Sequence, residues 1–337
     1  MLSYLYGIVL FIRNIFFDIK VFKETSFNIP IISVGNLSLG GTGKTPHIEY
    51  LIKLLKNEFK IATLSRGYKR KTKGFILSNN NSTIKEIGDE PLQFKLKFKD
   101  IKVAVDEKRV NGVKQIIKTH PTTNVILLDD AYQHRAIGRG INILITEYNN
   151  LYTSNYVIPS GTLREFSLGS KRANVIIVSK CPSKISEEEK DNVIQELSPE
   201  NYQSVFFTYI KYGQLLPFSN IAEKNKIINK LETNVVLITG IAKPEPLIKQ
   251  LTQEFKSTKH IKFPDHHSFD SKDLENIKTQ YKNLEYNNKI IITTEKDIMR
   301  LSLPSIIEKI QDIPIYYIPI EICFHGNGKK EFANIYF

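Results

Sequence analysis

The chain has 337 residues, of which 41% are hydrophobic and 24% are charged. That balance argues against a disordered chain or a multi-span membrane protein, and the length allows two domains with separate cores. Lys and Arg outnumber Asp and Glu by 47 to 35. The surface should therefore attract nucleotide, nucleic acid or acidic lipid head groups, although a genomic bias toward Lys, Asn and Ile explains the excess equally well. Cys181 and Cys323 show neither metal-ligand nor disulfide spacing, which indicates a reducing, cytoplasmic setting.

The first 23 residues carry an apolar run that Arg13, Asn14 and Asp18 interrupt. The run is too broken for a spanning helix, which needs about 20 predominantly apolar residues, and it lacks the features of a signal peptide. On a helical projection one face gathers Leu5, Val9, Ile12, Phe16 and Ile19, and another gathers Ser3, Gly7, Asn14 and Asp18. We expect residues 1–25 to form an amphipathic helix in a membrane interface, with Arg13, Lys20 and Lys23 near anionic head groups. A helix buried against the first domain is the alternative.

Short β-branched runs alternate with helix-like stretches along the chain. The first set covers residues 31–35, 61–65, 103–105, 125–129, 141–146 and 175–179, and the second covers 235–239, 261–263 and 290–294. Such continuous apolar runs predict α/β domains with mostly parallel sheets flanked by helices. The stretch 209–231 is rich in turn and polar residues, so we expect a first domain over 26–212 and a smaller α/β domain over 213–337. Residues 205–210 and 315–320 are candidate strands that pair to join the domains.

A glycine-rich loop follows the first of these runs. Residues 36–45 read Asn-Leu-Ser-Leu-Gly-Gly-Thr-Gly-Lys-Thr and lead into a helical pattern over 48–55. In a P-loop the backbone N–H groups surround phosphate oxygens, the lysine reaches the β- and γ-phosphates, and the hydroxyl ligates Mg²⁺. The strict pattern has glycine where Ser38 stands, but strand, loop and helix occur in the required order. The predicted nucleotide-binding residues are Ser38, Leu39, Gly40, Gly41, Thr42, Gly43, Lys44 and Thr45; a turn that binds no nucleotide is the alternative.

The apolar run 125–129 ends in Asp129 and is followed by Asp130. A buried strand that ends in a carboxylate supplies the second protein ligand for the Mg²⁺ of such a loop, although Asp129 could instead cap a helix. Residues 294–297 read Thr-Glu-Lys-Asp, which puts the lysine one place too late for the guanine-reading segment of GTPases. ATP is therefore the expected nucleotide. The basic run 69–73 beside Tyr68 is interpreted as a solvated loop, and we expect no nucleic-acid partner.

Several further motifs occur with the P-loop in one fixed order. They are Ser65-Arg-Gly-Tyr68, Gly88-Asp-Glu-Pro91, Asp106 with Arg109, Asp129-Asp130 with Gln133-His134, Pro159 through Leu163-Arg-Glu165, Gly240-Ile-Ala with Pro244, Asp265-His-His267 and Thr293-Thr-Glu-Lys-Asp297. With the apolar N-terminus, this ordered set closely resembles the tetraacyldisaccharide 4'-kinase family of the lipid A pathway. The resemblance covers nearly the whole chain. It implies transfer of the ATP γ-phosphate to the 4'-hydroxyl of a tetraacylated glucosamine disaccharide 1-phosphate, giving lipid IVA.

The resemblance also implies roles for individual residues. Asp89 matches the family's general base, His266 the residue that orients it, and Lys44 the catalytic lysine. The implied metal ligands are Thr45, Asp129 and Glu165. The residues that match the mouth of the active site or support it are Tyr68, Glu90, Arg109, Asp130, Gln133, His134 and Arg164. The chain departs from the family pattern in having Ala131-Tyr132 where Gly-Phe is usual and Phe166 where Pro is usual, which changes the local backbone freedom.

The expected location is the cytoplasmic face of the inner membrane, with peripheral or monotopic attachment through the N-terminal helix and no obligate protein partner. One alternative is a membrane-associated P-loop ATPase or switch without a lipid acceptor, whose ATP turnover would not depend on the disaccharide. Another is a sugar or nucleoside kinase with a soluble acceptor, for which removing residues 1–23 would leave activity and membrane recovery unchanged.

Overall fold

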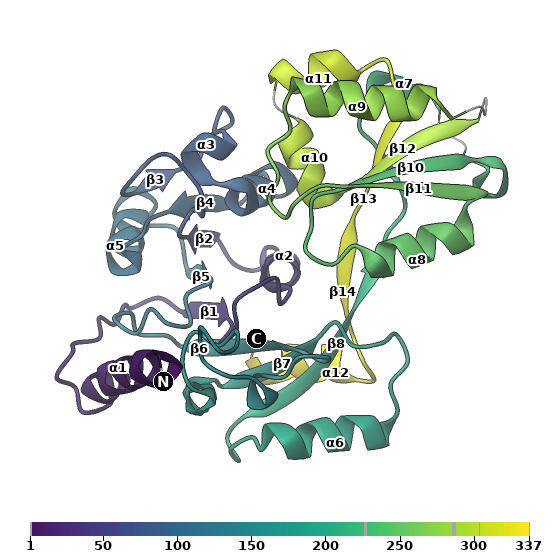
Figure 1. Cartoon of the computed structure of the whole chain (residues 1–337). Helices are drawn as coiled ribbons and strands as arrows, with labels where there is room; N and C mark the ends of the chain where they lie inside the picture. The colour runs from purple at the N-terminus through teal and green to yellow at the C-terminus, as the bar shows by residue number, and fades with distance from the viewer. Residues whose placement is uncertain (1, 226–227, 285–287, 303, 337) are drawn as a thin grey trace. The chain divides into compact units, whose positions relative to one another are not determined.

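A computed structural model describes residues 2–225, 228–284, 288–302 and 304–336 (Figure 1). The chain divides into two compact units. The first comprises residues 1–211 together with 321–337, and the second comprises residues 212–320. Each unit is built around one sheet, and both are of the α/β kind that the alternating pattern predicts.

The first unit contains a nine-stranded sheet in the order β14-β8-β7-β6-β1-β5-β2-β4-β3. The strand bounds are β1 (Ile31–Gly35), β2 (Ile61–Ser65), β3 (Ile76–Leu77), β4 (Lys102–Val105), β5 (Val125–Asp129), β6 (Ile141–Glu147), β7 (Val175–Ser179), β8 (Ser204–Tyr212) and β14 (Ile320–Phe324). From β8 to β4 all the pairs are parallel, and β1 lies between β5 and β6 in register Ile32↔Leu127 and Ile32↔Ile141. The loop after β1 therefore leaves the sheet beside the carboxyl end of β5, where Asp129 stands.

Alternate residues of these strands enter hydrophobic clusters on the two faces of the sheet, one cluster on the first face and two on the other. On one face, α2 (Lys44–Leu55), α4 (Asp89–Lys97) and α12 (Gly328–Tyr336) contribute side chains such as Ile52, Phe94 and Phe332. On the other face, α5 (Arg109–Thr119) and α6 (Glu187–Leu197) contribute Ile116 and Leu197 among others. The remaining short elements of this unit are α3 (Ile84–Ile87), η1 (Tyr152–Ser154) and η2 (Ser167–Arg172). Burial on both faces explains why the strands are continuous apolar runs.

The second unit has a five-stranded sheet in the order β11-β10-β12-β13-β9. Its strands are β9 (Leu216–Pro217), β10 (Asn234–Thr239), β11 (Ser257–Lys262), β12 (Lys289–Thr294) and β13 (Ile315–Ile318); its helices are α7 (Asn220–Lys224), η3 (Lys230–Glu232), α8 (Glu245–Glu254), α9 (Ser271–Lys282), α10 (Glu295–Leu301) and α11 (Pro304–Ile310). All pairs are parallel except β13 with β9. The strand expected over 261–263 begins earlier, at Ser257.

The C-terminal part of the chain differs from the sequence-based expectation. Residues 315–318 do not pair with 205–210 but form β13 beside β12, whereas β8 neighbours β14. Pro319 separates β13 from β14, and because proline has no N–H it cannot donate a hydrogen bond to a neighbouring strand. Residues 321–337 therefore belong to the first unit rather than to the second, where the boundary 213–337 had put them. Phe332 of α12 is buried in the core of the first unit.

The N-terminal helix α1 (Leu2–Asp18) lies along the first unit (Figure 1). Its buried residues are Ser3 and Gly7, and Ser3 Oγ lies 2.6 Å from Ser160 Oγ. Its large apolar side chains point outward, with Leu2 71% and Val9 65% exposed. The helix thus packs on the protein through its small and polar stripe and leaves its apolar face uncovered. In the described part of the chain, no helix has the length and apolar content needed to cross a bilayer.

Candidate active site

The glycine-rich loop joins the buried end of β1 to α2, which begins at Lys44. Gly40 and Gly43 have φ angles of 105° and 92°, in the region that L-residues with a Cβ rarely adopt. A Cβ at Gly40 would meet no atom within 4 Å, so the constraint there is the backbone conformation and not crowding. The two glycines allow the chain to curl at the start of a helix, which is the geometry that binds phosphate.

The carbonyl groups of this loop are held from inside the protein. Ser179 Oγ donates to the Thr42 carbonyl at 2.7 Å, and Lys180 Nζ donates to the Gly41 carbonyl. His47 Nδ1 lies 2.7 Å from the Gly43 carbonyl, so this nitrogen must donate. Burial lowers the pKa of His47 to about 4, which keeps the ring neutral. No sequence motif marks Ser179, Lys180 or His47, since their contacts depend on β7 and α2 meeting the loop.

Lys44, Thr45 and the two carboxylates after β5 are brought to one place. Lys44 Nζ lies 3.6 Å from Asp130 Oδ1 and donates to Asn36 Oδ1 at 3.3 Å. Thr45 Oγ1 donates to Glu90 Oε1 at 2.9 Å. The structure therefore gathers the predicted catalytic lysine, the predicted metal-binding hydroxyl and an acidic side chain of α4 at the start of α2.

Asp129 has the surroundings of a cation ligand. It is only 2% exposed, and its Oδ2 accepts a hydrogen bond of 3.2 Å from Ser65 Oγ. Its Oδ1 is buried and has no hydrogen-bond partner among the described residues. Burial raises the pKa of Asp129 to about 7, and Glu90 and Asp130 add to the effect. A buried carboxylate oxygen without a donor, near a hydroxyl and a second carboxylate, fits Mg²⁺, which prefers oxygen ligands.

Asp130 and the cations around it form the other side of this region. Arg164 Nη1 donates to Asp130 Oδ1 at 2.8 Å. Burial acts to raise the pKa of Asp130, but Lys44 and Arg164 outweigh it and hold the pKa below its usual range. The buried Arg109 donates to the Asp106 carbonyl at 2.7 Å and to the Asp129 carbonyl at 3.4 Å. These contacts fix the backbone that presents both carboxylates.

His134 and Gln133 follow the carboxylates along the chain. Burial lowers the pKa of His134 to about 4, with Arg109 acting in the same direction, so the ring is neutral. Gln133 Nε2 donates to the Asn36 carbonyl at 2.9 Å and to Glu165 Oε1 at 3.1 Å. Gln133 thus connects the P-loop to the segment that carries Glu165.

Glu165 is engaged differently from the other predicted metal ligands. Its carboxylate accepts from Arg172 at 2.7 Å and from Asn14 of α1 at 2.7 Å, in addition to Gln133. Both oxygens therefore have strong donors, and none of these contacts joins Glu165 to Thr45 or Asp129. Through Asn14 the carboxylate of Glu165 is joined to α1, and its predicted role as a metal ligand stays a prediction.

The two departures from the family pattern have local explanations. The Tyr132 hydroxyl donates to the Gly169 carbonyl at 2.8 Å, and the Arg172 guanidinium lies over its ring at 4.9 Å. Phe166 packs beside α1, where its ring lies edge-on to Phe11 at 6.4 Å. Both aromatic rings therefore contribute to packing.

Asp89 lies at the first position of α4 and is 8% exposed. Its Oδ1 accepts from its neighbour's backbone, the Glu90 N–H, at 3.0 Å. Because Glu90 also binds Thr45, the start of α4 lies beside the start of α2. The preceding Gly88 has a φ of 91° and turns the chain into α4, while the predicted support residue Tyr68 is 60% exposed.

His266 belongs to the second unit, where it lies between two cations. Its Nε2 is 3.0 Å from Lys296 Nζ and its Nδ1 is 3.1 Å from Arg300 Nη2. A neutral imidazole accepts at only one nitrogen, so only one of these contacts is a hydrogen bond to the ring. The adjacent His267 binds Asp273 at 2.7 Å, so the two histidines have separate partners. The predicted pairing of His266 with Asp89 stays a prediction.

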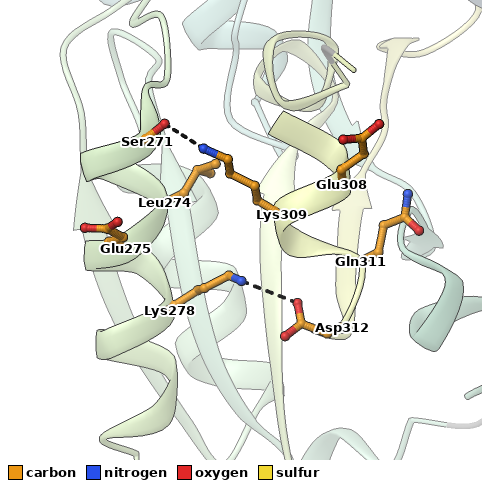
Figure 2. A pocket seen from close by; sticks show the side chains of 8 residues that line it. All are labelled: Ser271, Leu274, Glu275, Lys278, Glu308, Lys309, Gln311 and Asp312. Atoms are coloured by element: carbon orange, nitrogen blue, oxygen red, sulfur yellow. Dashed lines mark hydrogen bonds and ion pairs between the residues drawn. The ribbon is translucent and has the colours of Figure 1, made fainter. Parts of the chain in front are cut away.

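A surface pocket of about 460 Å³ lies between α9 and α11 in the second unit (Figure 2). It is lined by Ser271, Leu274, Glu275, Lys278, Glu308, Lys309, Gln311 and Asp312. Lys309 donates to Ser271 at 2.8 Å, and Lys278 lies 3.6 Å from Asp312. These contacts span the pocket, which contains none of the predicted site residues. The chemistry-bearing residues therefore lie elsewhere, around the P-loop of the first unit.

Comparison with known proteins gives the family. The model of the family described as "Tetraacyldisaccharide-1-P 4'-kinase" matches residues 1–335. A tetraacyldisaccharide 4'-kinase of Flavobacterium johnsoniae is 45% identical over 323 residues, covering 95% of this chain and 90% of that protein. This chain belongs to the tetraacyldisaccharide 4'-kinase family. The resemblance drawn from the ordered motifs is thereby confirmed.

Further relatives agree with the assignment to this kinase family. A tetraacyldisaccharide 4'-kinase of Flavobacterium psychrophilum is 46% identical over 329 residues, covering 97% of this chain and 92% of that protein. Among solved structures, LpxK of Aquifex aeolicus, described as an "apo" form in complex with ATP, matches with a TM-score of 0.71 at 24% identity. That match covers 100% of this chain and 98% of the other, and it confirms the predicted fold class.

Proposed function

We propose that this chain transfers the γ-phosphate of ATP to the 4'-hydroxyl of a tetraacylated glucosamine disaccharide 1-phosphate, forming lipid IVA. The observation that carries the proposal is the group formed by Lys44, Thr45 and the partnerless oxygen of Asp129 at the start of α2. That group has the composition of a phosphate and Mg²⁺ site, and family membership supplies the acceptor.

The side chains around the P-loop have separate proposed roles. Lys44 and the loop N–H groups bind the β- and γ-phosphates. Thr45, Asp129 and Glu90 are the side chains that would hold Mg²⁺, which when bound offsets charge on the phosphate oxygens. Arg164 keeps Asp130 ionised beside Lys44.

Asp89 is the proposed general base. A sugar hydroxyl is a weak nucleophile at neutral pH, so its proton must leave as the phosphoryl group arrives. Asp89 is a carboxylate at the start of α4, next to Glu90 and hence next to Thr45, and the Glu90 N–H fixes its orientation. The family match also assigns His266 to this reaction, and His266→Ala tests that assignment independently.

We further propose that the protein works at the cytoplasmic face of the inner membrane, held peripherally through α1. The outward apolar face of α1 supports this location, because contiguous exposed apolar patches mark interaction or membrane surfaces. Lys20 and Lys23 follow the helix on exposed positions and suit anionic head groups.

The test is incubation of the protein with labelled ATP and the lipid disaccharide in detergent, followed by identification of the phosphorylated position. Phosphate at the 4'-oxygen supports the proposal. Asp89→Asn should lower kcat by about 10²–10⁴-fold, the range for a general base, while ATP binding is retained. ATP turnover that is the same with and without the disaccharide would instead favour an ATPase or switch. Near-normal transfer by Asp89→Asn would remove that residue from the base role.

A further inference from the structure

Helices α2 and α4 carry the residues proposed to bind phosphate and Mg²⁺ and to act as the general base. Lys44 and Thr45 begin α2, and Asp89 and Glu90 begin α4. Both helices bury side chains in the same hydrophobic cluster, to which α2 gives Ile52 and its neighbours and α4 gives Phe94. Apolar packing of this kind holds helices together but is non-directional, so it defines their relative shift along the axis less strictly than hydrogen bonds do.

Polar contacts between α2 and α4 define that shift more strictly. Thr45 Oγ1 donates to Glu90 Oε1 at 2.9 Å. One turn further along α2, Glu49 accepts from Gln93 Nε2 at 2.7 Å and from Lys97 Nζ at 2.6 Å. Glu49 is 3% exposed and Gln93 6% exposed, so these bonds lie inside the protein.

The order of these contacts shows that the two helices run in the same direction. A step from Thr45 to Glu49 on α2 corresponds to a step from Glu90 to Gln93 and Lys97 on α4. Both positively polarised N-termini therefore lie at the same end, beside the P-loop. Parallel helix dipoles repel each other, so the buried contact of Glu49 with Lys97 helps to hold the two helices together.

We infer that Glu49 is a positioning residue for phosphoryl transfer. Through Gln93 and Lys97 it fixes how far α4 is shifted along α2, and so where Asp89 and Glu90 stand relative to Lys44 and Thr45. The inference rests on the proposed role of Asp89. Glu49 is 3% exposed and its carboxylate is engaged by Gln93 and Lys97, so it acts through α4. Its effect on the rate comes through distance, because a displacement of about 1 Å in a reacting group can cost about 10²-fold in rate.

The inference predicts different effects on ATP affinity and on the rate of phosphoryl transfer. ATP phosphates bind to the P-loop and to Lys44, and the loop carbonyls are held by Ser179 and His47, whereas α4 meets this site through the contact of Glu90 with Thr45. Loss of the Glu49 contacts should therefore change ATP affinity much less than it changes the rate of transfer, because most of the phosphate contacts do not involve α4. The phosphoryl-transfer step depends on α4 and should slow.

The experiment compares Gln93→Leu, Lys97→Met and Lys97→Arg in the full chain, with Lys56→Met as the matched control. Lys56 stands at the end of α2 and forms an exposed ion pair of 3.4 Å with Asp100. Measurements are kcat, KM for ATP, ATP binding and melting temperature, with rates expressed per folded molecule. We expect Lys97→Met and Gln93→Leu to lower kcat by about 10- to 100-fold, with the KM for ATP changed by less than about threefold. Lys97→Arg keeps the charge and should stay within about threefold of the parent.

Two outcomes would overturn the inference. If Lys97→Met and Gln93→Leu lower the melting temperature but keep the parent kcat per folded molecule, Glu49 serves stability alone. If Lys56→Met lowers kcat as strongly, the effect is not specific to the buried contacts. Asp89→Asn, measured in parallel, separates the two proposals. Full activity of Asp89→Asn would contradict the role of Asp89 as the general base. Loss of activity in Asp89→Asn together with normal activity in Lys97→Met would contradict the positioning role of Glu49.

Discussion

Helices α1 and α2 are both amphipathic and both belong to the first unit, but they use their faces in opposite ways. Four apolar side chains of α2 are 0–2% exposed against the sheet, namely those of Ile48, Leu51, Ile52 and Leu55. In α1 the buried residues are Ser3 and Gly7, and apolar side chains such as Leu5 and Val9 are 54% and 65% exposed. The same kind of pattern therefore leads one helix to cover a core and the other to present an apolar surface.

The difference arises from the residues that each helix carries on the face opposite its apolar side chains. The outer positions of α2 carry residues such as Lys53, which prefer water. The inner stripe of α1 is small or hydrogen-bonding, so its backbone can come close to Phe166, while Asn14 and Arg13 bind Glu165 and the Gln133 carbonyl. A helix held by such a stripe has a defined orientation, and its apolar face stays exposed, which supports the proposed contact with a membrane.

The largest effect should come from the chemistry at α2 and should leave α1 untouched. Lys44→Ala removes the cation beside Asp130 and the proposed phosphate contact, so transfer to the lipid should fall by about 10³-fold, as for loss of a donor that stabilises developing charge. Binding to anionic vesicles should be unchanged. Both are measured on the same preparation by a labelled-ATP assay and by vesicle sedimentation. Parallel loss of vesicle binding would show that the two functions are not separate.

Local sequence signals predicted much of the first unit. The bounds of β1, β2, β5 and β7 agree with the apolar runs, because each strand is buried on both faces. The P-loop and Asp129 were found because their function requires particular residue types at the ends of strands. The amphipathic pattern of α1 was also visible in the sequence.

The contacts that depend on distant segments were not predictable in this way. The pairing of β14 with β8 brings together segments more than 100 residues apart, and no local pattern distinguishes β14 from β13. Glu49, His47 and Ser179 look like ordinary helix or strand residues until Gln93, the Gly43 carbonyl and the Thr42 carbonyl meet them. Glu165 was assigned by family match, and its partners on α1 became evident only in three dimensions.

A smaller effect should follow from charging the outward face of α1. Burial of a Leu or Val side chain is worth about 1.5–3 kcal/mol, so Leu5→Glu or Val9→Glu should weaken vesicle binding by about 10- to 100-fold. The kcat on detergent-solubilised acceptor should be unchanged, since both side chains are more than half exposed and point away from the protein. Leu231→Glu is the matched control, because Leu231 is 78% exposed in the second unit. Equal vesicle binding by Val9→Glu and the parent protein would mean that the exposed face of α1 does not meet the membrane.

The smallest effect should come from the inner stripe of α1. A Cβ at Gly7 would lie 2.4 Å from Phe166 Cζ, so Gly7→Leu must shift the helix or the ring. Overpacking of this kind costs about 1–3 kcal/mol, which should appear as a lower melting temperature of the first unit. Val9→Leu, on the outward face, provides the control and should leave the melting temperature of the first unit unchanged. Vesicle binding should survive in Gly7→Leu, because the apolar face is intact, and transfer in detergent should stay within about threefold. An unchanged melting temperature would mean that α1 is only loosely held, and the inward polar stripe would then not explain the orientation of its apolar face.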